Sequence, residues 1–330
     1  MEPLIETYYS SGFFQIISQF ERTVFGKIPF SIGDVLYLIL IFYLLQSIWK
    51  TRNTWKISWK RHCFRFFKII VAIYLLFQFF WGLNYYRQPL SEKMKIKTEY
   101  SNQDLINFTE KIIDETNKIQ ISITKNSSLP VKNPYTDNQL IQLTQNGYDN
   151  LASKYPFFAY KTQSIKPSLF SSPLSYMGFS GYLNPFTNEA QFNSKVPKYG
   201  LPMTICHEMA HQIGYANESE CNFIGFLAAE KNNDLYFKFA ANTLALKYSL
   251  RAIQTFDEQK SKQFYEKINF GIKQNFAQDE AFRLQYKSFI EKGFLTFYDY
   301  FLKLNQQKDG LESYSRFLDL LINYKKSNAF

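Results

Sequence analysis

The chain has 330 residues, of which 46% are hydrophobic and 20% are charged, and its formal net charge is +10. This length suffices for one well-cored domain of ordinary size and an additional element. The positive charge does not indicate a nucleic-acid partner, because seven of the ten excess charges lie in residues 50–68, which hold no acid, and no nucleic-acid motif occurs elsewhere.

Residues 1–30 are expected to form an amphipathic N-terminal segment. One face of a helix there would carry the apolar residues Phe13, Ile16, Ile17, Phe20 and Val24. Such a helix would either lie on the outer surface of a membrane or pack against the domain that follows. The pattern leaves both arrangements open.

Two apolar runs come next, and each approaches the roughly 20 residues that span a bilayer. We expect transmembrane helices at 31–50 and 68–87, joined by a basic cytoplasmic loop at 51–67. Two buried core helices are the alternative. Because short basic loops stay in the cytoplasm, both termini and residues 91–330 would lie on the extracytoplasmic side of a bacterial inner membrane.

The soluble part is predicted to be mainly α with a small β element. Ser101, with Asp104 three residues later, is typical of a capping-box start and predicts a helix at 101–123; a second helix is predicted at 136–155, ended by Pro156. The segment 157–200 is rich in proline and glycine, and "SYMGFSGYL" (175–183) and "NEAQFN" (188–193) are typical of two short strands around a turn. After residue 200 the chain is expected to be almost entirely helical.

The segment "HEMAH" (207–211) holds two of the three histidines of the chain and matches the H-E-x-x-H pattern. Residues four apart lie on one face of a helix, so His207 and His211 can bind one metal ion together. Glu208 is close enough to accept a proton from a metal-bound water, which zinc acidifies to a pKa of about 7. The pattern therefore predicts a zinc site with Glu208 as general base.

The opposite face of this helix predicts how it packs. Ile205, Met209 and Ile213 would enter the core, so the histidine face would open on a cleft. Gly214 would end the helix.

A catalytic zinc takes three protein ligands, and two acids compete for the third position. Asn217 can cap a second helix, "ESECNFIGFLAAEK", which contains both. Glu220 shares a face with apolar residues that must point into the protein, whereas Glu218 lies on the other side with Asn222 and Gly225. The helical wheel of this second helix therefore favours Glu220 as the third ligand, with Glu218 as the alternative. Glu220 could instead act as the capping-box partner of Asn217.

Larger sequence segments resemble known families. "HEMAHQIGYANESECNFIGFLAA" resembles the glutamate-zincin class of metallopeptidases, and it is similar to bacterial immunity-type metallopeptidases whose second helix reads E-A-N-x-F-A, with a cysteine at 221 and a glycine at 225 as departures. Together with "YYSSGFFQIISQF", "WGLNYYRQPL" and "GFSGYLNPFTNEAQFN", nearly the whole chain resembles a bacterial family catalogued as domain of unknown function 3810. The resemblance implies a zincin-like α+β metallopeptidase domain.

Zincins bind substrate as an added strand beside the active-site helix. The candidates for that edge are Gly178, Phe179, Ser180 and Gly181. A second electrophile usually stabilises the oxyanion. Tyr314 and Arg316 in "SYSRF" are candidates, as are Tyr176 and Tyr182, and each also has a structural interpretation.

The sequence thus predicts a membrane-anchored zinc metallopeptidase that hydrolyses peptides or proteins. The alternative is a non-catalytic envelope protein of zincin fold that binds a peptide or protein partner. Cys206 and Cys221 would both lie outside, where a disulfide is permitted, although two small buried thiols are the favoured interpretation.

Overall fold

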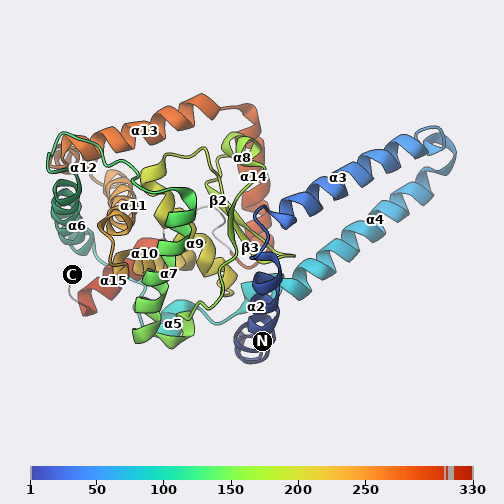
Figure 1. Cartoon of the computed structure of the whole chain (residues 1–330), viewed down its shortest axis with the longest axis horizontal. Coiled ribbons are helices and arrows are strands. Elements are labelled where there is room, and N and C mark those ends of the chain that lie inside the picture. Colours follow the sequence, from blue (N-terminus) through green and yellow to red (C-terminus); the bar gives the residue numbers. More distant parts are fainter. Residues whose placement is uncertain (1, 308–309, 311–315, 329–330) are drawn as a thin grey trace.

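The computed structural model describes residues 2–307, 310 and 316–328, and these form a globular part from which a long helical hairpin projects (Figure 1). The prediction of a mainly helical chain with a small β element is confirmed. The helices of the globular part are α5 (Leu90–Met94), α6 (Asn102–Thr124), α7 (Asp137–Lys154), α8 (Ser171–Met177), α9 (Leu201–Gln212), α10 (Glu218–Lys231), α11 (Leu235–Gln254), α12 (Glu258–Glu266), α13 (Phe270–Tyr286), α14 (Phe289–Leu304) and α15 (Phe317–Ser327), with short 3₁₀ turns η3 (Pro156–Phe158) and η4 (Lys198–Gly200).

Helices α6 and α7 begin as the sequence predicts. Ser101 and Thr136 each close a capping box with the residue three positions later. Each cap satisfies backbone N–H groups that have no partner inside the helix.

The sheet has three strands in the order β1-β3-β2: β1 (Ile165–Pro167), β2 (Gly181–Asn184) and β3 (Glu189–Phe192). β2 pairs antiparallel with β3, with Gly181 opposite Phe192, and β1 pairs parallel with β3. The prediction that residues 175–183 form one strand is only half correct, because 175–177 belong to helix α8. Strand β1 was not predicted, since three residues are too few to show a period.

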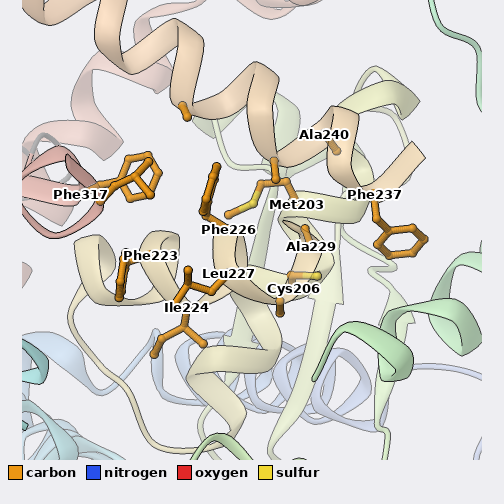
Figure 2. Packing of buried hydrophobic residues seen from close by; sticks show 14 of the residues in the cluster. Met203, Cys206, Phe223, Ile224, Phe226, Leu227, Ala229, Phe237, Ala240 and Phe317 are labelled. Atoms are coloured by element: carbon orange, nitrogen blue, oxygen red, sulfur yellow. The ribbon is translucent and has the colours of Figure 1, made fainter. Parts of the chain in front are cut away.

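The core lies between α9, α10, α11 and α15. Figure 2 shows side chains of all four helices in one cluster, including Met203 and Cys206 of α9 and Phe317 of α15. α10 is buried from Glu218 to Ala229, on all its sides. A helix without an exposed stripe is typical of the interior of a large domain.

The hairpin consists of α3 (Ile32–Thr51) and α4 (Trp55–Phe80), both long and apolar enough to cross a membrane. The expectation of a basic loop at 51–67 is wrong in its extent, because α4 already begins at Trp55. The second helix ends at Phe80 rather than at 87, and the 3₁₀ turn η2 (Gly82–Tyr86) follows. The side chains of lysine and arginine are long and helix-compatible, so a basic segment need not be a loop.

The first turn of α3 is bound to the sheet. Ser31 caps the helix by accepting the N–H of Asp34, and the carboxylate of Glu189 on β3 accepts the N–H groups of Ile32 and Gly33 at 3.1 and 2.6 Å. A carboxylate at a helix N-terminus also interacts favourably with the helix dipole. These hydrogen bonds therefore attach the start of the hairpin to the sheet of the folded domain.

The N-terminal segment forms α1 (Glu2–Leu4), a π-helical stretch η1 (Ile5–Phe13) and α2 (Phe14–Phe25). α2 packs on the domain through Phe14 and the polar side chains of Ser18, Glu21 and Arg22. Its exposed side carries apolar residues, namely Phe13 at its start, Ile16, Phe20 and Val24. The helix thus packs on the domain and also presents outward the apolar face that the sequence predicts.

Candidate functional site

Helix α9 carries the two histidines, and its boundaries follow from its sequence. Pro202 stands in the first turn, where its missing N–H costs nothing, and the helix ends two residues before Gly214. Gly214 has φ +89°, a conformation that side chains disfavour. Ile205, Met209 and Ile213 are buried as predicted, so the histidine face points the other way.

Helix α10 crosses α9 closely on that histidine face. Asn217 caps α10 by accepting the N–H groups of Ser219 and Glu220. A Cβ atom at Gly225 would lie 2.9 Å from the backbone nitrogen of His207, so only glycine permits this approach. The side of α10 that bears Glu218, Asn222 and Gly225 therefore faces the histidines.

Three side chains converge between the two helices. The Nε2 atoms of His207 and His211 lie 3.1 Å apart. Oε2 of Glu218 lies 3.1 Å from Nε2 of His207 and 3.6 Å from Nε2 of His211. Burial raises the pKa of Glu218, but the nearby His211 and His207 outweigh it and hold this pKa well below its usual range. Two imidazoles and an ionised carboxylate are a donor set that zinc prefers.

The structure brings Glu218, not Glu220, to the two histidines, which corrects the preferred sequence prediction. Glu220 points to the other side of α10, where its Oε1 accepts the N–H of Leu90 at 2.6 Å. Burial raises the pKa of Glu220 to about 7. The helical wheel failed because α10 is buried on all sides, so its apolar face does not mark the direction of the site.

Both imidazoles are oriented by acceptors at their outer nitrogens. Nδ1 of His207 lies 2.9 Å from Oδ1 of Asn222, and Nδ1 of His211 lies 2.7 Å from the carbonyl oxygen of Tyr215. An amide oxygen and a carbonyl oxygen can only accept, so each Nδ1 carries a proton and each Nε2 is the nitrogen that faces the cluster. Metal-binding histidines are typically held in this way.

Glu208 lies beside the cluster with an incompletely bonded carboxylate. Burial raises the pKa of Glu208 to about 7, against the opposing effect of His207 and His211. Its Oε2 is buried and has no hydrogen-bond partner within the described part of the chain. A carboxyl group with this pKa can exchange a proton near neutral pH.

A cavity of about 1090 Å³ opens over the cluster. Strand β2 lies at the edge of the sheet and forms one wall, and a Cβ atom at Gly181 would lie 2.7 Å from Oε1 of Glu208. The four residues predicted to bind a substrate strand, Gly178, Phe179, Ser180 and Gly181, all line this cavity. Only Gly181 of these is part of the strand, and Gly178 ends α8 instead.

The four residues predicted as possible electrophiles lie in different places. Tyr314 lies outside the described residues. Arg316 is exposed at the start of α15 and is not among the described residues that line the cavity. Tyr182 does line it, and its hydroxyl donates to Asp34. Tyr176 is not among the described residues that line the cavity; it is exposed on α8, and its ring packs edge-on against Tyr286.

Sequence reasoning missed two side chains that touch the cluster. Asn222 orients His207, and its place one turn after Glu218 is the signal that could have found it. Tyr298 of α14 donates its hydroxyl to Oε1 of Glu218 at 2.8 Å. Tyr298 is 80 residues away in sequence, and no local pattern distinguishes it from the other tyrosines.

The last turn of the histidine helix is bound by the N-terminal part of the chain. The four successive carbonyl oxygens of residues 211–214 accept hydrogen bonds from Trp81, Ser18, Gln15 and Arg87, at 3.5, 2.7, 3.1 and 2.6 Å respectively. Residues 211 and 212 end α9, and residues 213 and 214 form the turn that follows, so these side chains bind the C-terminal end of the helix and its turn. The predicted domain at 91–330 would therefore lack, on its own, contacts that hold the end of the histidine helix.

The cysteines are free thiols. Cys206 and Cys221 are both fully buried, and no disulfide joins them. Sγ of Cys221 lies 3.1 Å from the carbonyl oxygen of Tyr215, to which it can donate. Cys206 packs in the hydrophobic core (Figure 2).

Comparison with known proteins gives one result for the whole chain. Neither a search of curated proteins nor a search of solved structures found a match. Residues 9–322 match the family described as "Protein of unknown function (DUF3810)", and the chain belongs to this family.

Proposed function

We propose that the protein is a membrane-anchored zinc metallopeptidase of zincin-like type, with its active site on the extracytoplasmic side of a bacterial inner membrane. The observation that carries the proposal is the convergence of His207, His211 and Glu218 beside the buried, incompletely bonded carboxylate of Glu208. H-E-x-x-H on a helix supplies the same roles in zinc peptidases.

The spacing of the donor atoms fits zinc. Tetrahedral ligands at 2.0–2.1 Å from the ion lie about 3.3 Å from one another. The three separations here are 3.1, 3.1 and 3.6 Å. Three protein ligands would leave one coordination position open, as catalytic zinc sites require.

The residues around the cluster supply the remaining parts of a hydrolytic site. Zinc held there would polarise the scissile carbonyl and make an attacking water more acidic. Glu208 would accept the proton of that water and later donate it to the leaving amine, for which a pKa of about 7 is well suited. Strand β2 would hold the substrate backbone as an added strand next to Glu208.

The state of Glu208 also bears on the non-catalytic alternative. Burying a carboxylate oxygen without a hydrogen bond costs free energy. A protein that only binds a partner gains nothing from that cost, because Glu208 is not one of the three clustered donors. A general base requires such a free oxygen.

Three isosteric variants of the full chain in detergent test the proposal. We expect E208Q to keep one zinc per chain, measured by plasma mass spectrometry, and to lose at least 1000-fold in the hydrolysis of a mixed peptide library. E218Q should lower zinc affinity by at least 10-fold, whereas E220Q should retain it. Hydrolysis by E208Q at the parent rate would refute the mechanism, and zinc loss in E220Q but not E218Q would refute the ligand assignment.

Cys63 provides a test of the sidedness. It is exposed on α4 next to the basic residues, while the other two cysteines are buried. If the basic segment is cytoplasmic, a membrane-impermeant maleimide should label intact spheroplasts poorly and label them fully after permeabilisation. Full labelling of intact spheroplasts would place the hairpin tip outside and the active site in the cytoplasm.

A further inference from the structure

The cavity over the cluster extends to the membrane hairpin. Beyond the two histidines its wall is formed by Leu40 and Ile41 of α3 and Phe77 of α4. Leu40 comes eight residues after the start of α3, about 12 Å along the helix axis. The outer side of α3 is already apolar and exposed at that level, as Leu36 and Ile39 show. This end of the cavity therefore lies where the hairpin would enter lipid.

The opposite end of the cavity has a different character. It is lined by Lys247 of α11 and by Asp279 and Arg283 of α13, of which the first two form an ion pair. The cavity thus runs from a charged end, past the cluster, to an apolar end at the hairpin. A ligand that fills it would have one polar end and one end at the membrane.

Helix α14 lies next to the apolar end and also exposes apolar side chains. One face of α14 lines the cavity through Phe294, Tyr298 and Phe301, and Phe301 contacts Phe77 of the hairpin with ring centroids 6.0 Å apart. Phe289 and Leu304, at its two ends, are exposed. Figure 1 places α14 and α2 at the foot of the hairpin, on the side from which it projects. Exposed apolar helices at this position are expected to lie in the membrane interface.

Strand β2 leads from the cluster to the start of the hairpin. Its first residue, Gly181, contacts Glu208, and its last residue, Asn184, pairs with Glu189, the acid that binds the first turn of α3. Three residue steps in a strand cover about 10 Å. A peptide aligned on β2 would therefore pass from the catalytic acid to the membrane hairpin within about three residues.

The free edge of β2 fits a peptide better than a lipid chain. The N–H of Asn193 donates to the carbonyl of Ser180 at 2.8 Å, which fixes the alternation of the ladder. Gly181 and Leu183 therefore direct their N–H and C=O groups away from β3. An extended peptide can pair with these groups, whereas an acyl chain cannot.

We propose that the substrate is a polypeptide anchored in the same bilayer, cleaved within a few residues of the membrane surface. The anchored end would leave the cavity at Leu40, Ile41 and Phe77, and the free end would extend toward the charged end. This inference rests on the proposed peptidase function for the cleavage, but the binding of an anchored peptide can be measured without it.

The test uses the full-length E208Q variant with zinc in lipid nanodiscs, and peptide probes of mixed sequence with benzophenone at the third residue from the anchor. The same mixture carries an N-terminal palmitoyl group, a transmembrane helix or only an acetyl group. We expect at least 10-fold more photo-adduct with either anchored probe than with the acetylated one, mapped by mass spectrometry to β2 or α14. Adduct with only one anchored probe would identify the anchor type and support the proposal.

Two variants of one helix separate specific binding from crowding at the membrane surface. I41N changes the cavity wall, and I39N makes the same substitution two residues away, at an exposed position outside the cavity. I41N should lower the adduct at least fivefold, and I39N should leave it unchanged. Equal yields in I39N and I41N, equal yields for anchored and acetylated probes, or complete displacement by palmitate alone would each overturn the proposal.

Cleavage by the parent chain is the separate measurement. If the anchored probe forms the adduct but the parent hydrolyses no probe, the proposed peptidase function is wrong. The proposal that the cavity binds a membrane-anchored polypeptide still stands in that case. If the parent cleaves the acetylated probe as fast as the anchored ones, the peptidase function stands and the membrane-anchored substrate is wrong.

Discussion

Helices α2 and α6 bury opposite kinds of side chain. α6 buries Phe108 and Ile112 and exposes charged residues such as Glu110, as a helix in contact with water does. α2 buries Glu21 and Arg22 and exposes Ile16 and Phe20. Figure 1 shows the two on opposite sides of the globular part, with α2 at the foot of the hairpin.

The difference is expected if the two helices face different solvents. Burial of apolar side chains away from water is favourable, and a helix face that exposes several of them is typical of a membrane interface. The polar side chains of α2 then serve the protein interior, where Ser18 bonds the end of the histidine helix and Arg22 bonds the carbonyl of Thr162. In a chain anchored as proposed, α6 would face water and α2 would face lipid.

The largest effect is expected from removing one buried ring on each side. F14A in the N-terminal helix and F108A in α6 should each lower the free energy of unfolding by about 3–5 kcal/mol. Only F14A should also weaken zinc binding, because Phe14 packs against Gly214 at the end of the histidine helix. Denaturant unfolding in detergent and zinc titration measure both effects. Equal zinc affinities in the two variants would show that the N-terminal helix does not support the site.

A comparable effect, which depends on pH, is expected from the buried acid of α2. Burial raises the pKa of Glu21 from 4.5 to about 8, against the opposing effect of Arg22. The folded state then holds this proton more tightly than the unfolded state, so the contribution to stability is full below pH 4.5 and is lost as pH rises through 8. At about 1.4 kcal/mol per pKa unit, the rise from 4.5 to about 8 corresponds to a loss of about 5 kcal/mol at most.

The variant E21Q should flatten that decline, and E110Q on the exposed face of α6 should leave it unchanged. Thermal unfolding in detergent at pH 5 and pH 9 gives the comparison. The opposite trend is expected at low pH from Glu6, where Arg87 and Lys93 outweigh the effect of burial and lower the pKa to about 2. That contribution is present above pH 4.5 and is lost as pH falls toward 2.

The smallest effect on stability should come from substitutions at exposed positions. A tryptophan placed there reports by its fluorescence whether water or lipid surrounds it. Tryptophan introduced by I16W on α2 or by I121W on α6 replaces an exposed isoleucine. In nanodiscs with brominated lipid, the first should be quenched by the lipid and the second by iodide in the water. Equal quenching of both by iodide would remove the distinction between the two sides.

The sequence predicts those features that depend on local patterns. The caps at Ser101 and Asn217, the end of α9 near Gly214 and the buried face of Ile205 and Met209 are all found in the structure. Each depends on residues within one or two helical turns. The pattern of His207, Glu208 and His211 belongs to the same class, which is why a candidate site could be named at all.

Contacts between distant segments could not be predicted in the same way. The choice of Glu220 over Glu218 assumed that α10 has an exposed side, and only the packing of α9, α11 and α15 around it shows that it has none. Tyr298 and Trp81 reach the site from segments about 80 and 130 residues away from their partners. Nothing in their local sequence indicates these contacts.

The hydrogen bonds that Ser18, Gln15, Trp81 and Arg87 donate to the end of α9 and the turn after it also determine how a soluble version could be engineered. A truncation at residue 90 would discard all four donors together. A better design would keep residues 1–35 and 77–330 and replace the projecting part of the hairpin with a short flexible linker. The excised region holds the greater part of the two apolar helices, while the segments that complete the histidine helix are retained.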